Sequence, residues 1–364
     1  MEDMVNKSFW KGKSVLITGH TGFKGSWLSV WLRRMGACVT GYSLAPPTIP
    51  NNFQLTGIGN DISTITGDIA DLSSVEKAVK TCQPEIVFHL AAQSLVRRSY
   101  ADPVETYSTN MMGTVHILEA IRKTDSVRAV INVTSDKCYE NKEWVWGYRE
   151  NDPMGGYDPY SSSKGCAELI TSAYLRSFFN PVEYGKHGVA LASVRAGNVI
   201  GGGDFGDDRL VPDIVRAFSS GESVHIRLPD SVRPWQHVLE PLSGYLMLAE
   251  KLYNEGGKYS GAWNFGPSED CVKTVGWIVE KIAGFWGQGA KWTIDNGNHP
   301  HEAQLLKLDC SKASTLLGWR SLFSIEKTLE WTVDWYKLYC SNPSSLREKT
   351  EEQITKYENH TPTA

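Results

Sequence analysis

The chain has 364 residues, 41% of them hydrophobic, and a formal net charge of -4 at pH 7. This length allows a large core and two lobes, and the nearly balanced charge excludes the strongly basic surface of a typical nucleic-acid-binding protein. No stretch of the sequence approaches the ~20 apolar residues of a membrane-spanning helix, so we expect neither nucleic acid nor membrane as a partner.

The compartment is indicated by the N-terminus and the cysteines. Residues 1–13 are polar and lack the apolar core of a signal peptide. The chain has 7 cysteines, which are scattered and form no C-x-x-C pair. This pattern is typical of free thiols in a reducing environment, so we expect a cytoplasmic protein.

Short apolar runs alternate with helical patterns through the first half of the chain. The runs that predict β-strands cover residues 14–17, 37–42, 64–68, 86–90, 129–133 and 189–195. Helical periodicity covers residues 26–35, 72–82, 103–122 and 159–179. This alternation predicts an α/β fold with a Rossmann-type, doubly wound parallel sheet and helices on both faces.

The pattern changes after residue 198, where short helices, prolines and tryptophans mix. We expect a Rossmann domain over residues 1–197 with a return segment near 235–262. A smaller, mixed α/β lobe is expected over 198–234 and 263–340. Residues 341–364 are polar and weakly patterned, which predicts a tail with little helix.

A glycine-rich turn, Gly19-x-x-Gly22-x-x-Gly25, joins the first strand to the first helix. Gly19 permits a tight turn, Gly22 lets the backbone approach a pyrophosphate, and Gly25 lets helix and strand pack closely. The following helix offers free N–H groups at its N-terminus. The turn predicts a dinucleotide site, although its spacing differs from the commoner G-x-G-x-x-G. The alternative is an ordinary strand-to-helix turn.

Tyr160 and Lys164 are four residues apart, so both lie on one face of a predicted helix. A phenol with a pKa near ~10 is a poor base at neutral pH, but an ammonium and a cationic nicotinamide nearby favour the phenolate. A phenolate can take the proton of an alcohol as hydride leaves its carbon. The pair predicts an NAD(P)-dependent enzyme acting on a sugar-like alcohol. The alternative is a Tyr and a Lys on a solvated surface.

Several motifs together resemble the extended short-chain dehydrogenase/reductase family. They are the glycine turn, His89-Leu90-Ala91-Ala92-Gln93, Asn110 with Gly113-Thr114, Tyr160-x-x-x-Lys164, Arg195-Ala196-Gly197-Asn198, Leu210-Val211-Pro212, Arg233-Pro234-Trp235-Gln236-His237 and Trp263-Asn264-Phe265-Gly266. The resemblance extends over residues 14–335 and is to the branch of nucleotide-sugar epimerases and 4,6-dehydratases. Within that branch, segments 19–28, 135–139 and 299–303 are similar to the 4,6-dehydratases that act on CDP-glucose.

The resemblance implies NAD as the cofactor and assigns roles to matched positions. The implied cofactor-binding residues are Gly19, His20, Thr21, Gly22, Phe23, Lys24, Ser43, Asp68, Ile69, Leu90, Ala91, Ala92, Asn110, Thr134, Tyr160 and Lys164. The implied substrate-binding residues are Gln93, Asn198, Arg209, Leu210, Arg233, His237 and His301. The implied catalytic residues are Ser135, Asp136, Lys137, Tyr160 and Lys164.

The implied reaction converts CDP-glucose to CDP-4-keto-6-deoxy-D-glucose and water, a step in the biosynthesis of deoxysugars such as those of O-antigen lipopolysaccharide. Tyr160 and Lys164 would handle the proton at C4 of the sugar, and Ser135 would bind the C4 oxygen. Asp136 would protonate the leaving C6 hydroxyl. The resemblance also implies a homodimer or homotetramer, assembled through two helices of each subunit.

Two positions depart from the pattern of the related enzymes. Thymidine-linked 4,6-dehydratases usually carry a glutamate, the base at C5, where this chain has Lys137. A lysine acts as a base only when neutral, which burial or neighbouring positive charge would favour. At the end of the second strand, Ser43 stands where an acid often binds the adenosine ribose, so we expect a loose hold on the cofactor.

Three other interpretations remain open from the sequence. A nucleotide-sugar 4-epimerase would use the same motifs, but it does not need Asp136 and Lys137. A non-catalytic NAD-binding sensor would not need Tyr160 and Lys164. His299-x-His301 could suggest a metal site, but two histidines without a clear third ligand favour an ordinary loop, so we expect no metal. Residues 204–208 are expected to form a solvated loop.

Overall fold

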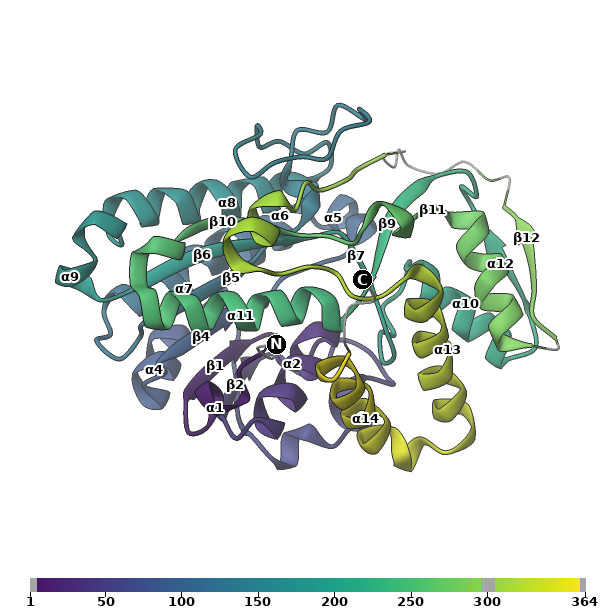
Figure 1. Ribbon diagram of the computed structural model, residues 1–364, viewed down its shortest axis with the longest axis horizontal. Coiled ribbons are helices and arrows are strands. Elements are labelled where there is room, and N and C mark those ends of the chain that lie inside the picture. Colours follow the sequence, from purple (N-terminus) through teal and green to yellow (C-terminus); the bar gives the residue numbers. More distant parts are fainter. Residues whose placement is uncertain (1–4, 288, 296, 298–304, 361–364) are drawn as a thin grey trace.

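The computed structural model describes residues 5–287, 289–295, 297 and 305–360 (Figure 1). A seven-stranded sheet lies at its centre, with strand order β10-β6-β5-β4-β1-β2-β3 and all neighbours parallel. The strands are β1 (Ser14–Thr18), β2 (Cys38–Ser43), β3 (Ser63–Thr66), β4 (Ile86–His89), β5 (Ala129–Val133), β6 (Ala190–Ala196) and β10 (Gly261–Phe265). The predicted fold class is confirmed.

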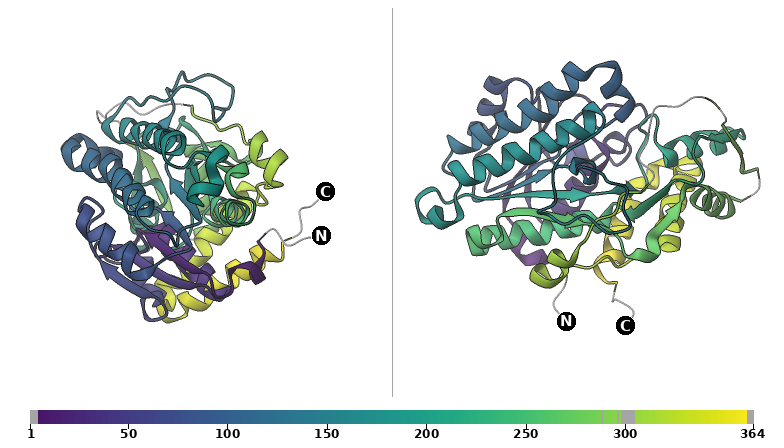
Figure 2. Two further views of the ribbon diagram at one scale, coloured as in Figure 1. Left: turned by 90° about the vertical axis from the view of Figure 1, so that its left-hand side faces the viewer. Right: turned by 90° about the horizontal axis from the view of Figure 1, so that it is seen from above.

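Helices cover both faces of this sheet, as the end-on view in Figure 2 shows. One layer contains α4 (Leu72–Cys82), α7 (Gly113–Arg122) and α8 (Pro159–Ser177), and the other contains α2 (Phe23–Arg34), α11 (Leu239–Glu255) and α14 (Leu346–Glu358). Successive residues of β1 point into different cores: Val15 and Ile17 into one, Leu16 into the other. Burial on both faces explains why the strands read as continuous apolar runs.

The rest of the chain forms smaller units beside the carboxyl ends of the sheet. Their strands are β7 (Asn198–Ile200), β9 (Val232–His237) and β11 (Val272–Thr274) in one sheet, and β8 (Ser223–Ile226) with β12 (Lys291–Ile294) in another. Their helices are α10 (Leu210–Ser219), α12 (Val275–Trp286) and α13 (Ile325–Ser341). The division into two lobes at residue 198 stays a prediction.

The segment expected as one helix over residues 103–122 is divided into three. It consists of α6 (Pro103–Tyr107), a π-helical turn at Ser108–Met112 and α7. Such turns widen the helix locally and often occur at functional sites. The remaining short helices are α1 (Lys7–Trp10), α3 (Asn52–Leu55), α5 (Val96–Ala101) and α9 (Tyr184–His187).

The prediction of a polar tail from residue 341 is wrong for the part that the structure describes. Helix α14 packs against α2, where the indole N–H of Trp31 donates to Glu358 at 2.9 Å. The hydroxyl of Tyr357 donates to the carboxylate of Glu240 at 2.9 Å. The helix carries many charges, but its few large apolar residues all lie on the face that packs, and this is why its sequence pattern is weak.

No helix within the described residues is both long enough and apolar enough to cross a membrane.

Candidate active site

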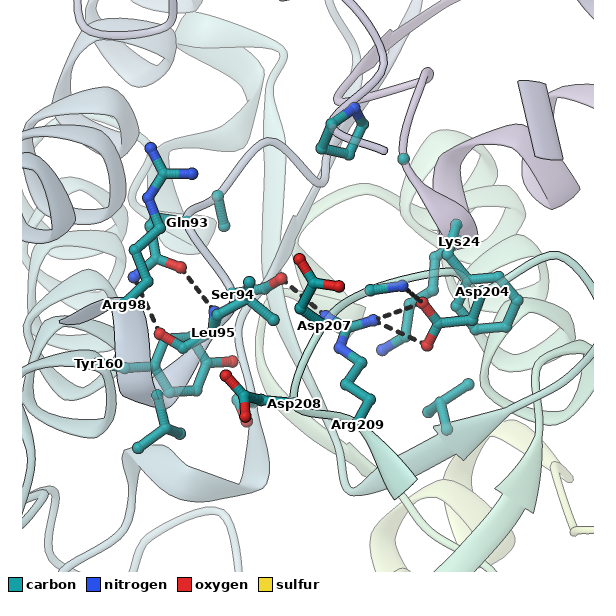
Figure 3. Close-up of a pocket in the computed structure, with 18 of the residues that line it drawn as sticks. Lys24, Gln93, Ser94, Leu95, Arg98, Tyr160, Asp204, Asp207, Asp208 and Arg209 are labelled. Carbon is teal, nitrogen blue, oxygen red and sulfur yellow. Dashed lines mark hydrogen bonds and ion pairs between the residues drawn. The ribbon is translucent and has the colours of Figure 1, made fainter. Parts of the chain in front are cut away.

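A cavity of about 1150 Å³ opens at the carboxyl ends of β1, β2, β4, β5 and β6. Ligands of open α/β sheets bind at this edge. The second wall of the cavity comes from residues 203–213 and from β8 and β9. Figure 3 shows side chains from both walls meeting across it, among them Tyr160, Lys24, Asp204 and Arg209.

The glycine turn forms one end of the cavity and is shaped by close backbone contacts. Gly19 has a φ of +76°, and a Cβ there would lie 2.7 Å from the amide nitrogen of Ala91. A Cβ on Gly25 would lie 2.2 Å from the carbonyl oxygen of Gly19. Helix α2 begins at Phe23 with Gly22 as its N-cap, and no side chain caps its first N–H groups. These residues fit a pyrophosphate, which needs close backbone approach and free N–H donors.

Tyr160 lies in the first turn of α8, close to the end of β5. The helix begins with Pro159, which suits a first turn, and its N-cap Asp158 accepts a hydrogen bond from the amide of Ser161 at 2.9 Å. The phenol of Tyr160 hydrogen-bonds with Ser135. The hydroxyl of Ser135 in turn donates to Asp136 Oδ1 at 3.0 Å. One serine therefore links the candidate base to the candidate acid.

Burial drives all three titratable groups at this centre toward their neutral forms. It raises the pKa of Tyr160 to about 12, against the opposing effect of the Ser135 hydrogen bond. It lowers the pKa of Lys164 to about 8, although Glu168 opposes it. It also raises the pKa of Asp136, despite the nearby Lys137. A raised pKa keeps Asp136 protonated over a wider range of pH, which suits a general acid.

A second group of charges stands beside this centre. The guanidinium of Arg209 donates to both carboxylate oxygens of Asp204, at 3.0 and 2.9 Å, and to Ser94 Oγ at 2.8 Å (Figure 3). Arg209 thus spans the cavity from one wall to the other. Burial, helped by Arg209, lowers the pKa of Lys24 to about 8, while Asp136 and Asp204 oppose the change. The sequence-based view of residues 204–208 as a solvated loop is therefore wrong for Asp204, which is buried.

Beneath the cavity lies a buried ion pair that the sequence analysis missed. Arg195 in β6 donates to Glu168 in α8 at 2.7 Å, and each side chain is 3% exposed. Glu168 also accepts hydrogen bonds from Thr134 and Ser193, so β5, β6 and α8 are joined at one point. The sequence signal for this ion pair was Arg195, a charged residue within an apolar strand. Charged residues are almost never buried without a partner, so a buried acid should have been expected beside it.

The structure brings most of the predicted site residues to this cavity. Those that line it are Gly19, Thr21, Gly22, Phe23, Lys24, Ser43, Asp68, Ile69, Leu90, Ala91, Ala92, Gln93, Thr134, Ser135, Asp136, Lys137, Tyr160, Lys164, Asn198, Arg209, Leu210 and Arg233. Of these, Ser43 has its hydroxyl already engaged, by Thr21 at 2.9 Å and His20 at 3.2 Å.

Three predicted residues lie outside the lining, and a fourth is outside the described residues. His20 is buried beneath the glycine turn, against Phe53. Asn110 is buried at the π-helical turn, where its side chain accepts from the Gln93 amide at 2.8 Å and donates to the Gln93 carbonyl at 2.9 Å. Asn110 thus orients a lining residue and does not line the cavity itself. His301 lies outside the described residues.

His237 is the clearest correction. It is fully buried, and its ring packs against Trp27, Phe323 and Trp331. Burial lowers its pKa to about 3. The prediction that His237 binds substrate is wrong, because β9 turns its side chain into the aromatic core. The motif match showed only that His237 is close to site residues in sequence.

No group of three or more His, Cys, Asp or Glu side chains in the described part of the chain is arranged to hold a metal ion. The cavity combines a glycine turn that fits a pyrophosphate with a tyrosine, a serine and a lysine near the end of β5. These features define the class of protein as a dinucleotide-binding α/β enzyme of the short-chain dehydrogenase/reductase type.

Comparison with known proteins identifies the family. The profile of the family described as GDP-mannose 4,6 dehydratase matches residues 16–332. The CDP-glucose 4,6-dehydratase of Salmonella typhimurium is 58% identical over 343 residues, covering 94% of this chain and 96% of the relative. The chain therefore belongs to this dehydratase family, and the resemblance seen in the sequence is confirmed.

Solved structures agree on the fold. An epimerase from Methanothermobacter thermautotrophicus superposes with a TM-score of 0.77 at 21% identity, covering 95% of this chain and 97% of that one. A dTDP-glucose 4,6-dehydratase from Bacillus anthracis, solved in complex with NAD, gives a TM-score of 0.72 at 21% identity, covering 92% and 100%.

Proposed function

We propose that this protein is a CDP-glucose 4,6-dehydratase, a hydro-lyase that converts CDP-glucose to CDP-4-keto-6-deoxy-D-glucose and water. The observation that carries the proposal is the linked set Tyr160, Ser135 and Asp136 in one cavity, where burial raises the pKa of the Asp136 carboxyl. The relative that is 58% identical bears the same activity in its name.

The cofactor is NAD, and the glycine turn is the part of the chain that fits its pyrophosphate. Asp68 and Ile69 line the end of the cavity where the adenine would lie. NAD supplies a site that accepts hydride from C4 of the sugar and later returns it to C6. Because the hydride returns, the reaction needs no external oxidant or reductant.

The first task of the protein is to remove the proton of the C4 hydroxyl. Ser135 holds the C4 oxygen, and the phenolate of Tyr160 accepts its proton as the C4–H bond breaks. Lys164, one turn further along α8, favours the phenolate when it is charged. The product of this step is a 4-keto sugar, whose carbonyl acidifies the neighbouring C5–H bond.

The second task is to expel the C6 hydroxyl. The side-chain amine of Lys137 takes the C5 proton, and Asp136 gives its own proton to the hydroxyl, which leaves as water. A double bond then joins C5 and C6. Hydride adds at C6, and Lys137 returns its proton to C5, so that atoms and charges balance at the sugar.

The nucleoside diphosphate is held at the other wall of the cavity. Asn198 and Arg233 line this wall, and Arg209 spans the cavity beside them. Arginine suits a diphosphate because its planar guanidinium binds two oxygens at once. We further propose that the chain works in the cytoplasm as a homodimer or homotetramer, in deoxysugar and lipopolysaccharide biosynthesis.

The second candidate is a nucleotide-sugar 4-epimerase, which the Tyr160–Ser135 pair would also serve. An epimerase breaks neither the C5–H nor the C6–O bond, so it has no use for a buried acid at Asp136. A non-catalytic sensor, the third candidate, leaves Tyr160 and Lys164 without a role.

The test is incubation of the purified chain with CDP-glucose and NAD. We expect a product with the ultraviolet absorbance that 4-keto-6-deoxy sugars develop in base. Formation of CDP-galactose without a deoxy sugar would establish the epimerase. NAD binding without conversion of CDP-glucose would favour the sensor.

A further inference from the structure

Two arginines from opposite walls of the cavity meet at one carboxylate. Arg97 lies on α5, on the wall formed by the parallel sheet, and its guanidinium is 3.1 Å from Asp208 Oδ1. Arg227 follows β8 on the other wall and is 3.8 Å from the same oxygen. All three side chains line the cavity. None of the three was among the predicted site residues.

The carboxylate reaches this position from a strained loop. Asp208 has a φ of +56°, in the left-handed region that non-glycine residues rarely adopt. Its side chain is 42% exposed and that of Arg97 is 38% exposed. Ion pairs this exposed contribute little to stability because water screens them. The contact between Asp208 and the two arginines is therefore easily displaced.

The two guanidinium groups lie against the same carboxylate oxygen from opposite walls of the cavity. The carboxylate of Asp213 also lies close enough to Arg227 for their charges to interact. A nucleotide sugar carries two negative charges on its diphosphate, and guanidinium groups bind phosphate and carboxylate oxygens with the same geometry. A diphosphate would thus offer each arginine an oxygen partner of its own, whereas both now share one oxygen of Asp208.

We propose that Arg97 and Arg227 form a clamp for the diphosphate of the substrate, and that Asp208 occupies this clamp until the diphosphate displaces it. The proposal rests on the proposed function, since it takes the ligand to be a nucleoside diphosphate. It adds two substrate-positioning residues, one from each wall, and makes residue 208 an internal competitor of the substrate.

The neighbouring residue offers a matched control. Asp207 lies in the same loop and lines the same cavity, but its side chain is 82% exposed and its ion pair is with Arg216, at 3.7 Å. Asp207→Asn therefore removes an equal charge next to the clamp without releasing Arg97 or Arg227. Asp208→Asn keeps the backbone unstrained relative to the parent, because Asn tolerates the left-handed region as well as Asp does.

The experiment is titration calorimetry of the full chain with CDP, and with cytidine, which lacks phosphates. We expect Arg97→Gln and Arg227→Gln each to weaken CDP binding by about 5- to 20-fold, as for a partly exposed charge-assisted contact. Cytidine binding should not change in either variant. Asp208→Asn should bind CDP about threefold more tightly, and Asp207→Asn should stay within about twofold of the parent.

Each contrary result has a distinct meaning. Unchanged CDP binding in both arginine variants would show that no clamp exists. Equal effects of Asp208→Asn and Asp207→Asn would show that Asp208 acts only through general charge and does not occupy the clamp. An equal loss of CDP and cytidine binding would mean a damaged fold and would also overturn the clamp. A parent chain that binds no CDP would overturn the proposed function together with the clamp.

Discussion

Replacing Asp136 with Asn should stop the reaction after the first oxidation. The variant keeps Tyr160, Ser135 and Lys164, so hydride still leaves C4 of CDP-glucose. The C6 hydroxyl then has no acid beside it, and hydroxide is a poor leaving group. We expect reduced cofactor and 4-keto-glucose to accumulate on the enzyme in place of the 6-deoxy product.

The size of the effect follows from the role and from the surroundings of the residue. Loss of a general acid typically costs about 10²–10⁴ in rate, or about 3–5 kcal/mol in the barrier to water loss. The cost in stability should be only about 1 kcal/mol or less, because Asn has nearly the same shape as Asp and Ser135 can still donate to its side-chain oxygen, as it does to Asp136 at 3.0 Å.

The same substitution has a signature in the pH dependence of stability. Burial raises the pKa of Asp136 in the folded chain, so the folded state keeps a proton that the unfolded state releases above its pKa of ~3.9. The parent therefore loses stability as pH rises from the pKa of Asp136 in the unfolded chain to its pKa in the folded chain. The Asp136→Asn variant lacks this group and does not lose stability in that range. The stability of the variant relative to the parent should therefore be greater at neutral pH than at acidic pH. The measurement is urea unfolding of both proteins at the two pH values.

The assay is stopped-flow absorbance of reduced nicotinamide, with product analysis and solvent-deuterium exchange at C5. Exchange should continue in Asp136→Asn, because Lys137 still removes the C5 proton. In Lys137→Met, exchange should fall sharply and oxidation at C4 should remain. Formation of 6-deoxy product by Asp136→Asn within about tenfold of the parental rate would refute the assignment of Asp136 as the acid.

Three other predictions concern the base, the cofactor and the buried ion pair. Tyr160→Phe should lower the rate of the first hydride transfer by about 10²–10⁴-fold without unfolding the chain. If reduced nicotinamide forms at the parental rate in a single turnover, Tyr160 is not the base. Dialysis should remove NAD from the purified chain, because Ser43 stands where an acid would make a charge-assisted hydrogen bond to the ribose, worth about 1.5–3 kcal/mol. Stoichiometric retention of NAD would contradict this. Arg195→Met should cost about 3–5 kcal/mol in urea unfolding, because Glu168 would stay buried without its partner, and adding Glu168→Gln should recover much of the loss. An additive double variant would show that the two residues do not interact.

The sheet and the glycine turn could be predicted because their signals are local. A buried parallel strand needs a continuous apolar run, and a pyrophosphate cradle needs glycines at fixed spacing. Helix α14 could not be predicted in this way, because its packing depends on a few residues such as Tyr357 and their contacts with distant parts of the chain.

Sequence motifs selected most of the residues that line the cavity, but not the contacts that hold them in place. Motif matching found Tyr160 and Asp136, but it also selected His237, whose position in sequence does not reveal which way its side chain points. The Arg195–Glu168 pair and the contact of Arg209 with Ser94 join residues far apart in the chain. Only the folded structure brings such pairs together.

The pKa shifts at the centre connect the predicted weak binding of NAD to the proposed chemistry. The acid step proposed for Asp136 needs a protonated carboxyl, and burial raises the pKa of Asp136 in that direction. The base step needs Tyr160 ionised, yet burial raises its pKa to about 12 and lowers that of Lys164 to about 8, so the protein alone does not supply enough positive charge. The cationic nicotinamide ring of NAD⁺ would supply further positive charge beside the phenol. Tyr160 should therefore stay protonated until the cofactor is bound, and a chain that has lost NAD has lost its base as well as its hydride acceptor.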